Sequence, residues 1–250
     1  MPSTVLFSTP THRNVLLPEF GEGAAVQANQ HLIIDSGEGM VLDPGGHKVY
    51  AKVLNETFAQ LGGGKLKHLF LSHQDPDIVA AVNGWLMTTD VTAWCSALWT
   101  RFIPHFGVDK LVVDRLKGLP DSGGVLELGS IKLQVIPAHF LHSPGNFQVY
   151  DPVSKILYSG DLGASLGQSY LEVPDFDAHL QYMEGFHQRY MSGNAAMRAW
   201  AKRVRTLDIE LIAPQHGAYF RGKAMVNRFI DWCDTLECGV DLAAKWYGLP

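Results

Sequence analysis

Short apolar runs separated by turn residues dominate the first two thirds of the chain, and this pattern predicts β-strands. Residues 31–35 and 40–43 form two apolar runs, and the turn Ser-Gly-Glu-Gly between them predicts a hairpin. Residues 67–71 predict a short buried strand. Similar runs predict further strands at residues 91–95, 110–114, 125–128, 131–136, 147–150, 156–159 and 209–213.

Helical spacing of apolar residues appears between the strands and near the C-terminus. It predicts a helix at residues 47–61, which the following three glycines end. A Pro-Asp pair favours a helix start just before residues 78–86. Further helices are predicted at residues 175–191, 194–206 and 222–244. This order favours an α/β fold with two sheets and outer helices, as one domain over residues 1–250.

Composition and charge narrow the class of protein. The chain has 250 residues, of which 46% are hydrophobic, and its formal net charge is −5. A basic face for nucleic acid or an anionic membrane is therefore not expected. We find no signal-peptide pattern and no apolar stretch of membrane-spanning length. The three cysteines lack CxxC spacing, which suits a reducing compartment, and we expect a cytoplasmic protein.

Four segments share one arrangement, in which an apolar strand is followed at once by His or Asp beside Gly, Pro or Ser. Loops that leave strands at the same edge of a sheet can converge on one site. The four segments together therefore favour a shared site. They read LFLSHQDPD at residues 69–77, AHFLHSPG at 138–145, LYSGD at 157–161 and LIAPQHG at 211–217.

Each segment taken alone has a simpler explanation. Ser-Gly-Asp is common in turns, and Gln-His-Gly fits a surface loop. Asp75 suits a helix N-cap, and Asp77 suits the first helical turn. These alternatives stay open for single segments, but they do not explain why all four follow strands.

Together the four segments resemble the metallo-β-lactamase superfamily, an αββα sandwich of two central mixed sheets flanked by helices. An acid at position 75 and the turn Leu-His-Ser-Pro-Gly-Asn-Phe resemble the diiron domain of flavodiiron proteins and of stand-alone oxygen-binding relatives. The resemblance implies a binuclear metal site at one edge. It assigns His73, Asp75 and His142 to one metal, Asp77 and His216 to the other, and Asp161 as the bridge.

Two positions near these residues need separate treatment. His139 competes with His142, but the Ser-Pro-Gly turn and the nineteen-residue gap to Asp161 match the family at His142. His139 is therefore expected in a supporting or core position. Ile78 stands where the family usually has a histidine, so the second metal would have an open position.

Other side chains are candidates for supporting roles. His179 and His187 are candidates to replace the missing ligand, but a surface or supporting position is favoured for both. Tyr182 and Phe186 have helical spacing and suit core packing, or an apolar wall that admits small gases.

The resemblance implies a non-haem diiron protein that binds dioxygen, nitric oxide or peroxide, and that either reduces it with an external electron donor or acts as an oxygen sensor. Three histidines and three carboxylates suit two iron ions better than zinc, although zinc or manganese remain alternatives. We expect no flavodoxin or rubredoxin domain in this chain, and hence no FMN-binding domain. A flavoprotein or rubredoxin-like electron donor or a signalling partner is expected, and a homodimer is compatible. A metal-dependent hydrolase of an ester, lactone or thioester is the alternative.

Overall fold

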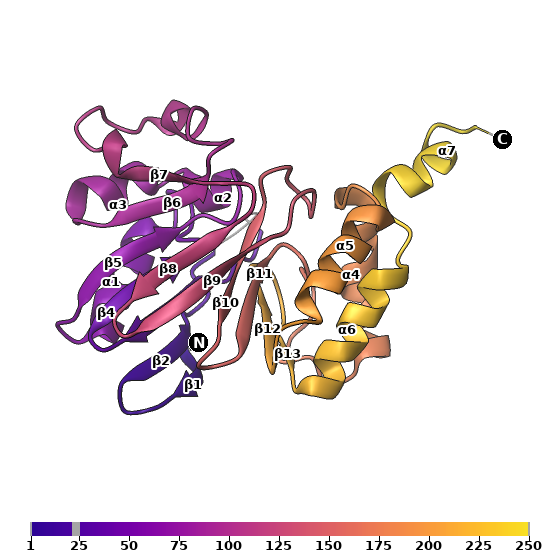
Figure 1. The fold of residues 1–250 in the computed structure, drawn as a ribbon, viewed down its shortest axis with the longest axis horizontal. Coiled ribbons are helices and arrows are strands. Elements are labelled where there is room, and N and C mark those ends of the chain that lie inside the picture. Colours follow the sequence, from indigo (N-terminus) through magenta and orange to yellow (C-terminus); the bar gives the residue numbers. More distant parts are fainter. Residues whose placement is uncertain (1, 22–25, 250) are drawn as a thin grey trace. The chain divides into compact units, whose positions relative to one another are not determined.

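The computed structural model describes residues 2–21 and 26–249 of the chain. The chain divides into two compact units, Met1–Ile136 and Pro137–Pro250. Each unit contains a mixed set of paired strands with helices beside it (Figure 1). The single domain expected over residues 1–250 stays a prediction.

The first unit is built on a seven-stranded sheet whose strands follow one another in sequence order. Neighbouring strands from β1 to β4 are antiparallel, and those from β4 to β7 are parallel. The predicted hairpin corresponds to β3 and β4. The strands are β1 (Thr4–Ser8), β2 (His12–Leu16), β3 (His31–Asp35), β4 (Glu38–Leu42), β5 (Lys65–Phe70), β6 (Thr92–Ser96) and β7 (Leu116–Leu119).

Several predicted elements of this unit differ in the structure. The strand predicted at residues 110–114 is wrong, because a short 3-10 helix, η2 (Val113–Arg115), occupies part of it and β7 follows. The helix predicted at residues 78–86 is divided into α2 (Pro76–Val79) and α3 (Val82–Thr88). Helix α1 (Tyr50–Leu61) ends at Gly62, whose left-handed φ of 57° suits glycine. It packs on β4 and β5.

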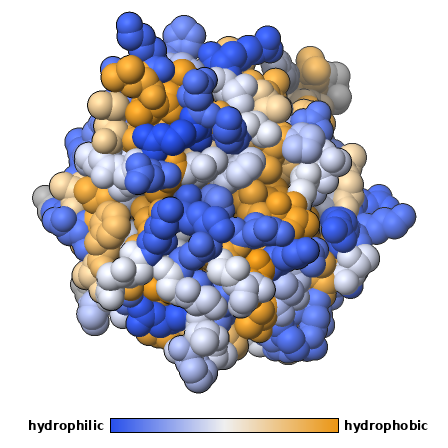
Figure 2. Space-filling view, turned by 60° about the vertical axis from the view of Figure 1, so that its left-hand side comes forward, coloured by the Kyte–Doolittle hydropathy of each residue, from blue (hydrophilic) through white to orange (hydrophobic). Residues whose placement is uncertain are grey.

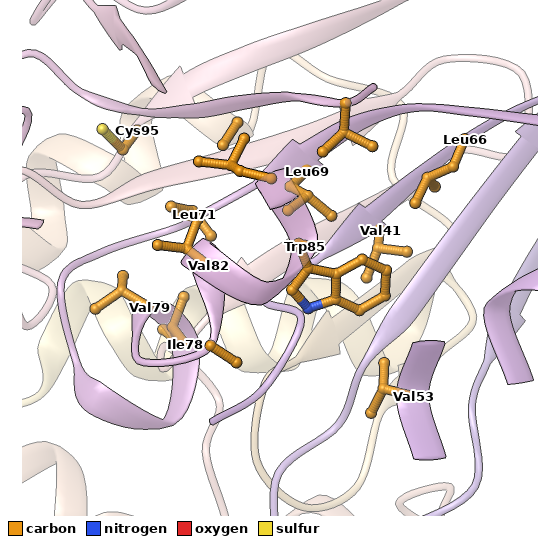
Figure 3. Close-up of a cluster of buried hydrophobic side chains, with 14 of the residues drawn as sticks. Val41, Val53, Leu66, Leu69, Leu71, Ile78, Val79, Val82, Trp85 and Cys95 are labelled. Carbon is orange, nitrogen blue, oxygen red and sulfur yellow. The ribbon is translucent and has the colours of Figure 1, made fainter. Parts of the chain in front are cut away.

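The apolar core of the first unit lies between its sheet and its helices. Trp85 and Ile78 are both 0% exposed and pack among aliphatic side chains of β4, β5 and α3 (Figure 3). Strand β5 supplies Leu66 and Leu69, and Leu71 follows it into the same cluster. This core fixes the end of β5, which is where the loop that carries His73 begins.

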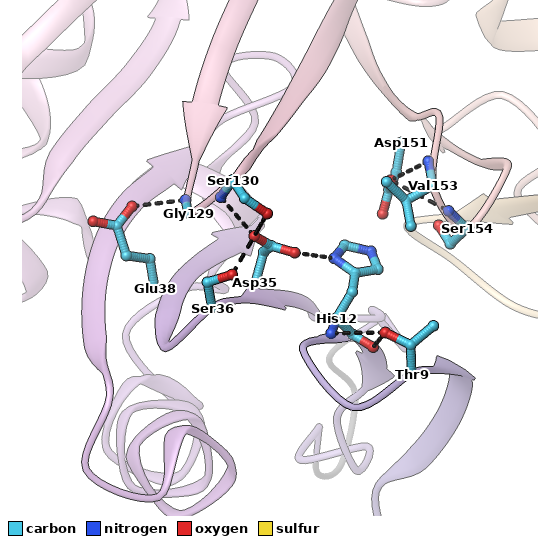
Figure 4. Close-up of polar contacts among 10 residues, drawn as sticks. All are labelled: Thr9, His12, Asp35, Ser36, Glu38, Gly129, Ser130, Asp151, Val153 and Ser154. Carbon is cyan, nitrogen blue, oxygen red and sulfur yellow. Dashed lines mark hydrogen bonds and ion pairs between the residues drawn. The ribbon is translucent and has the colours of Figure 1, made fainter.

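A hairpin of β8 (Gly124–Leu128) and β9 (Ile131–Pro137) is attached to the β3–β4 turn by carboxylates. Asp35 Oδ2 accepts hydrogen bonds from the backbone N–H of Ser130, at 2.7 Å, and from its hydroxyl, at 2.9 Å (Figure 4). Asp35 Oδ1 lies 3.1 Å from His12 Nδ1. Glu38 accepts a further bond from the N–H of Gly129. Burial acts to raise the pKa of Asp35, but these hydrogen bonds outweigh it and hold the pKa below its ordinary value.

Replacing Asp35 with asparagine should remove part of the acid sensitivity of the first unit. A depressed carboxyl pKa stabilises the fold above its unfolded value of about 3.9, and this stability disappears as pH falls through the folded value. We expect Asp35→Asn to lower the free energy of unfolding at pH 7 by about 1.5–3 kcal/mol, as for hydrogen bonds to a charged group. Urea unfolding at pH 7 measures the loss of stability. Urea unfolding below pH 4 measures how far this difference from the wild type shrinks as the Asp35 carboxylate is protonated.

The matched control for this prediction is Asp90→Asn, because Asp90 is exposed in the same unit. It should change stability by no more than about 0.5 kcal/mol. If Asp35→Asn behaved like this control at both pH values, the carboxylate would not stabilise the hairpin attachment.

The second unit contains four adjacent strands, β10 (Phe147–Asp151), β11 (Ile156–Gly160), β12 (Leu211–Pro214) and β13 (Phe220–Arg221). The β11–β12 pair is parallel, and the two outer pairs are antiparallel. Asp151 closes the β10–β11 turn by accepting from the N–H groups of Val153 and Ser154 (Figure 4). All residues of β10, β11 and β12 are buried.

Three long helices accompany these strands, α4 (Phe176–Tyr190), α5 (Asn194–Val204) and α6 (Lys223–Thr235). Helix α6 packs on β12 and β13, and α4 and α5 pack against α6 (Figure 1). The C-terminal helix predicted at residues 222–244 is interrupted after Thr235, and η3 (Gly239–Leu242) and α7 (Ala243–Trp246) follow. The face shown in Figure 2 mixes hydrophilic and hydrophobic residues. None of the described helices combines the length and apolar character needed to cross a bilayer.

Candidate metal centre

In the first unit, His73 and Asp75 lie between β5 and α2, and Asp77 lies in the first turn of α2. The N–H of Ser72 donates to Asp43 Oδ1 at 2.8 Å, which ties the loop to the end of β4. The hydroxyl of Ser72 lies 2.9 Å from Nδ1 of His73, and the His73 side chain is 1% exposed. A protonated Nδ1 that donates to this hydroxyl leaves Nε2 as the ligand atom. Nε2 lies 3.6 Å from Oδ2 of Asp75.

The two aspartates of this loop occupy the start of α2. Asp75 is the N-cap residue, but its side chain makes no capping hydrogen bond and faces His73 instead. Asp77 lies half-buried in the first turn of the helix. The N-cap role thus explains the backbone position of Asp75. It does not explain why the carboxylate of Asp75 points towards His73.

Ile78 points into the apolar core of the first unit. Its side chain is 0% exposed and lies beside Val79 and Leu71 in the cluster of Figure 3. An aliphatic residue there stabilises the helix start by burial, and no ligand atom is available from this position.

In the second unit, Asp161 faces two imidazoles with its two oxygens. Nε2 of His142 lies 3.1 Å from Oδ2, and Nε2 of His216 lies 3.5 Å from Oδ1. The parallel pairing of β11 and β12 explains part of this geometry, because Asp161 and His216 leave neighbouring strands at the same edge. The two oxygens of the Asp161 carboxylate thus face different imidazoles.

The loop that carries His142 is held by its own hydrogen bonds. The side-chain amide of Asn146 donates to the carbonyl of Leu141, and the N–H of Phe140 donates to the carbonyl of Ser143. The His142 ring lies edge-to-face with Phe186 and Tyr190, whose rings stack with centroids 4.6 Å apart. This loop therefore places an imidazole against an aromatic wall from α4.

The remaining histidines of this unit have other partners. Nε2 of His187 accepts from the N–H of Gly163 at 2.8 Å, and Nδ1 donates to the carbonyl of Met183 at 2.7 Å. Burial lowers the pKa of His187 to about 4, so the ring is neutral and braces the turn after Asp161. His139 is half-buried, with its ring edge-to-face with Phe147.

Tyr182 and His179 lie one turn apart on α4 near the same loop. The carbonyl of Tyr182 accepts from the N–H of Leu166, and the His179 ring is 0% exposed. Both nitrogens of His187 are engaged with backbone groups, which leaves neither as a ligand atom.

The sequence did not predict the supporting roles of Asp43 and Ser72 in the loop that carries His73. Their only signal was position, because one follows a strand end and the other directly precedes a histidine.

The chemistry of these donors fits a metal. Groups that could hold an ion include His73, Asp75, His142 and Asp161. Carboxylates and imidazoles in equal numbers are a harder donor set than one of imidazoles alone, and they suit iron or manganese as well as zinc. The Ser72 hydroxyl beside Nδ1 of His73 is a hydrogen-bond partner of the kind that orients metal-bound histidines.

Comparisons with known proteins identify the class of fold. The chain has a TM-score of 0.88 and 38% identity with a solved structure described as the peroxy diiron species of chemotaxis sensor ODP, over 98% of this chain and 100% of that chain. The apo state of chemotaxis sensor ODP from T. denticola is 37% identical, with a TM-score of 0.85. The flavodiiron protein from Giardia intestinalis shares the fold at 20% identity, with a TM-score of 0.76, over 92% of this chain and 58% of that chain.

The fold is therefore α/β and metallo-β-lactamase-like, with two mixed sheets flanked by helices, as the sequence predicted. A family model described as ODP family beta lactamase matches residues 26–217, and the chain belongs to this family. The resemblance to the diiron domain of flavodiiron proteins is confirmed. Diflavin flavoprotein A 1 of Synechocystis sp. is 25% identical over 227 residues, which make up 87% of this chain and 38% of that relative. The chain thus spans less than two fifths of this relative.

Proposed function

We propose that this protein is a non-haem diiron protein that binds dioxygen and acts as an oxygen sensor. The observation that carries the proposal is Asp161, whose two oxygens each face a different imidazole. His73, Asp75 and His142 would hold one ion, Asp77 and His216 the other, and Asp161 would bridge them.

The comparisons support a sensor more than a self-sufficient reductase. The two solved structures at 38% and 37% identity are both described as a chemotaxis sensor, and this chain covers 100% and 98% of them. A bound iron pair would supply the electrons with which dioxygen, or nitric oxide, is held. Continuous reduction of dioxygen would need an electron donor such as a flavoprotein or a rubredoxin-like protein. Under the sensor proposal, a signalling partner that recognises the loaded state takes the place of that donor.

The side chains around the proposed centre would control orientation and access. Ser72 fixes which nitrogen of His73 is presented, and neutral His187 braces the turn after Asp161. Phe186 and Tyr190 form an apolar wall beside His142. The ring faces of such a wall favour a small neutral ligand over a charged substrate, because burying a charge against them costs free energy.

The test is anaerobic loading with ferrous iron, followed by metal analysis and an optical spectrum on admitting oxygen. Two irons per chain and a new charge-transfer band are expected. Two tightly held zinc ions without any spectral response to oxygen, together with turnover of an ester or lactone, would replace the proposal with hydrolysis.

Replacing Ser72 with alanine should weaken metal binding while leaving the fold intact. The hydroxyl holds Nδ1 of His73, and loss of such a partner typically lowers metal affinity about 10- to 100-fold. Competition with a chromogenic chelator measures this affinity. Ser130→Ala is the control, because Ser130 bonds Asp35 and no proposed ligand. Equal affinities in the Ser72 variant and the control would show that the hydroxyl does not support His73.

A further inference from the structure

The second unit contains a tyrosine–histidine pair that the proposed metal centre does not use. The hydroxyl of Tyr170 lies 2.9 Å from Nδ1 of His179, and the centroids of the two rings are 5.7 Å apart. Tyr170 is half-buried in the segment before α4, whereas His179 lies inside the first turns of α4 and is 0% exposed. The pair joins a phenol to an imidazole that water does not reach.

The surroundings of His179 leave it as a neutral base with one partner. Nε2 has no hydrogen-bond partner among the residues that the structure describes, and the ring lies edge-to-face with Phe220. Burial lowers the pKa of His179 to about 4, so the imidazole is uncharged at neutral pH. The phenol is therefore the donor to Nδ1. The other titratable groups around the pair are Tyr182, Asp175 and His187.

A continuous chain of contacts links this pair to a proposed ligand. The Tyr170 ring lies edge-to-face with Tyr182 at 6.2 Å, and the Tyr182 carbonyl accepts from the N–H of Leu166 at 3.1 Å. The neighbouring N–H of Ser165 donates to the carbonyl of His216 at 3.3 Å. Tyr170 thus reaches the backbone of His216 through one ring contact, the covalent bonds of Tyr182 and of the Ser165–Leu166 backbone, and two hydrogen bonds.

We propose that Tyr170 and His179 form a proton-coupled redox site that supplies one electron to the iron centre after dioxygen has oxidised it. The inference rests on the proposed function for its oxidant. In the step, the O–H bond of Tyr170 breaks, the proton moves to Nδ1 of His179, and the electron passes along the contacts to the centre. The products are a phenoxyl radical, an imidazolium and a centre reduced by one electron.

The chemistry of the pair favours this step over a purely structural hydrogen bond. A phenol that loses an electron becomes strongly acidic, and an imidazole at hydrogen-bond distance accepts its proton without any movement of heavy atoms. Tyr182 touches both rings but shows no hydrogen bond to a histidine among the described residues. Tyr170 is reset when an external one-electron donor reduces the radical and the proton returns from His179.

The test is freeze-quench electron paramagnetic resonance after mixing the diferrous protein with oxygen. A tyrosyl radical is expected in the wild type and in Tyr182→Phe, and it should be absent in Tyr170→Phe. His179→Gln keeps a hydrogen-bond acceptor that cannot take the proton. It should lower the rate of radical formation about a hundredfold, at the lower end of what a positioned base contributes. Circular dichroism confirms that each variant is folded.

A second measurement separates this inference from the proposed function. The zinc-loaded protein is oxidised by a photogenerated ruthenium(III) complex, which needs no iron chemistry, and a radical that disappears in Tyr170→Phe is expected. A radical unchanged in Tyr170→Phe would overturn the inference. So would iron that oxygen oxidises without a Tyr170 radical appearing. Iron that oxygen does not oxidise, beside a Tyr170 radical in the ruthenium experiment, would overturn the proposed function and leave the redox pair supported.

Discussion

Asp161→Ala is expected to reduce the iron content of the protein from two ions per chain to one or none. The carboxylate faces His142 with one oxygen and His216 with the other, so its removal takes a ligand from both proposed ions at once. The loss of affinity should exceed the roughly 100-fold that marks the upper range for supporting residues. Metal analysis after anaerobic loading and gel filtration measures the ions retained, and the oxygen-dependent absorption band should disappear.

Asp177→Ala is the matched control for this variant. Asp177 belongs to the same unit, and its side chain is 71% exposed and pairs with Arg228 at the surface. Its loss should leave two ions bound and change stability little. If Asp161→Ala retained two irons and reacted with oxygen like the control, Asp161 would not be the bridge.

Ile78→His is expected to destabilise the first unit without completing the metal centre. The family resemblance implies a histidine at this position, but the structure places Ile78 at 0% exposure in the apolar core. An imidazole there would lose the packing of the isoleucine and bury a polar ring without partners. Together these effects should cost about 2–5 kcal/mol. Urea unfolding gives the loss, and metal competition shows whether affinity rises.

Ile78→Val separates packing from polarity at the same position. It removes one methylene group and should cost about 0.5–1.5 kcal/mol without any change in metal affinity. The opposite result for histidine, a stability close to that of the wild type with tighter binding of the second ion, would mean that the helix start can turn residue 78 towards the metals. The core packing of Figure 3 would then be one of two arrangements.

The candidate site could be read from the sequence because its residues follow strand ends. Parallel neighbours such as β11 and β12 end at the same edge, so Asp161 and His216 are brought together by a rule of sheet geometry. The direction of a side chain needs more than this rule. Asp75 faces His73 instead of capping its helix, and His187 braces a backbone turn with both nitrogens. Both outcomes depend on neighbours that local spacing does not specify.

The sequence by itself determined the α/β class, the β3–β4 hairpin and the family, because hydrophobic periodicity and four strand-end motifs are local signals. The tertiary structure decided the features that depend on partners far along the chain. Asp35 and Ser130 are 95 residues apart in the sequence, yet the Asp35 carboxylate joins the β3–β4 hairpin to the β8–β9 hairpin by hydrogen bonds. Residues 110–114 are apolar enough to suggest a strand, but pairing with β6 begins only at Leu116. Strand formation and buried hydrogen bonds need a partner in space, and only the folded chain supplies it.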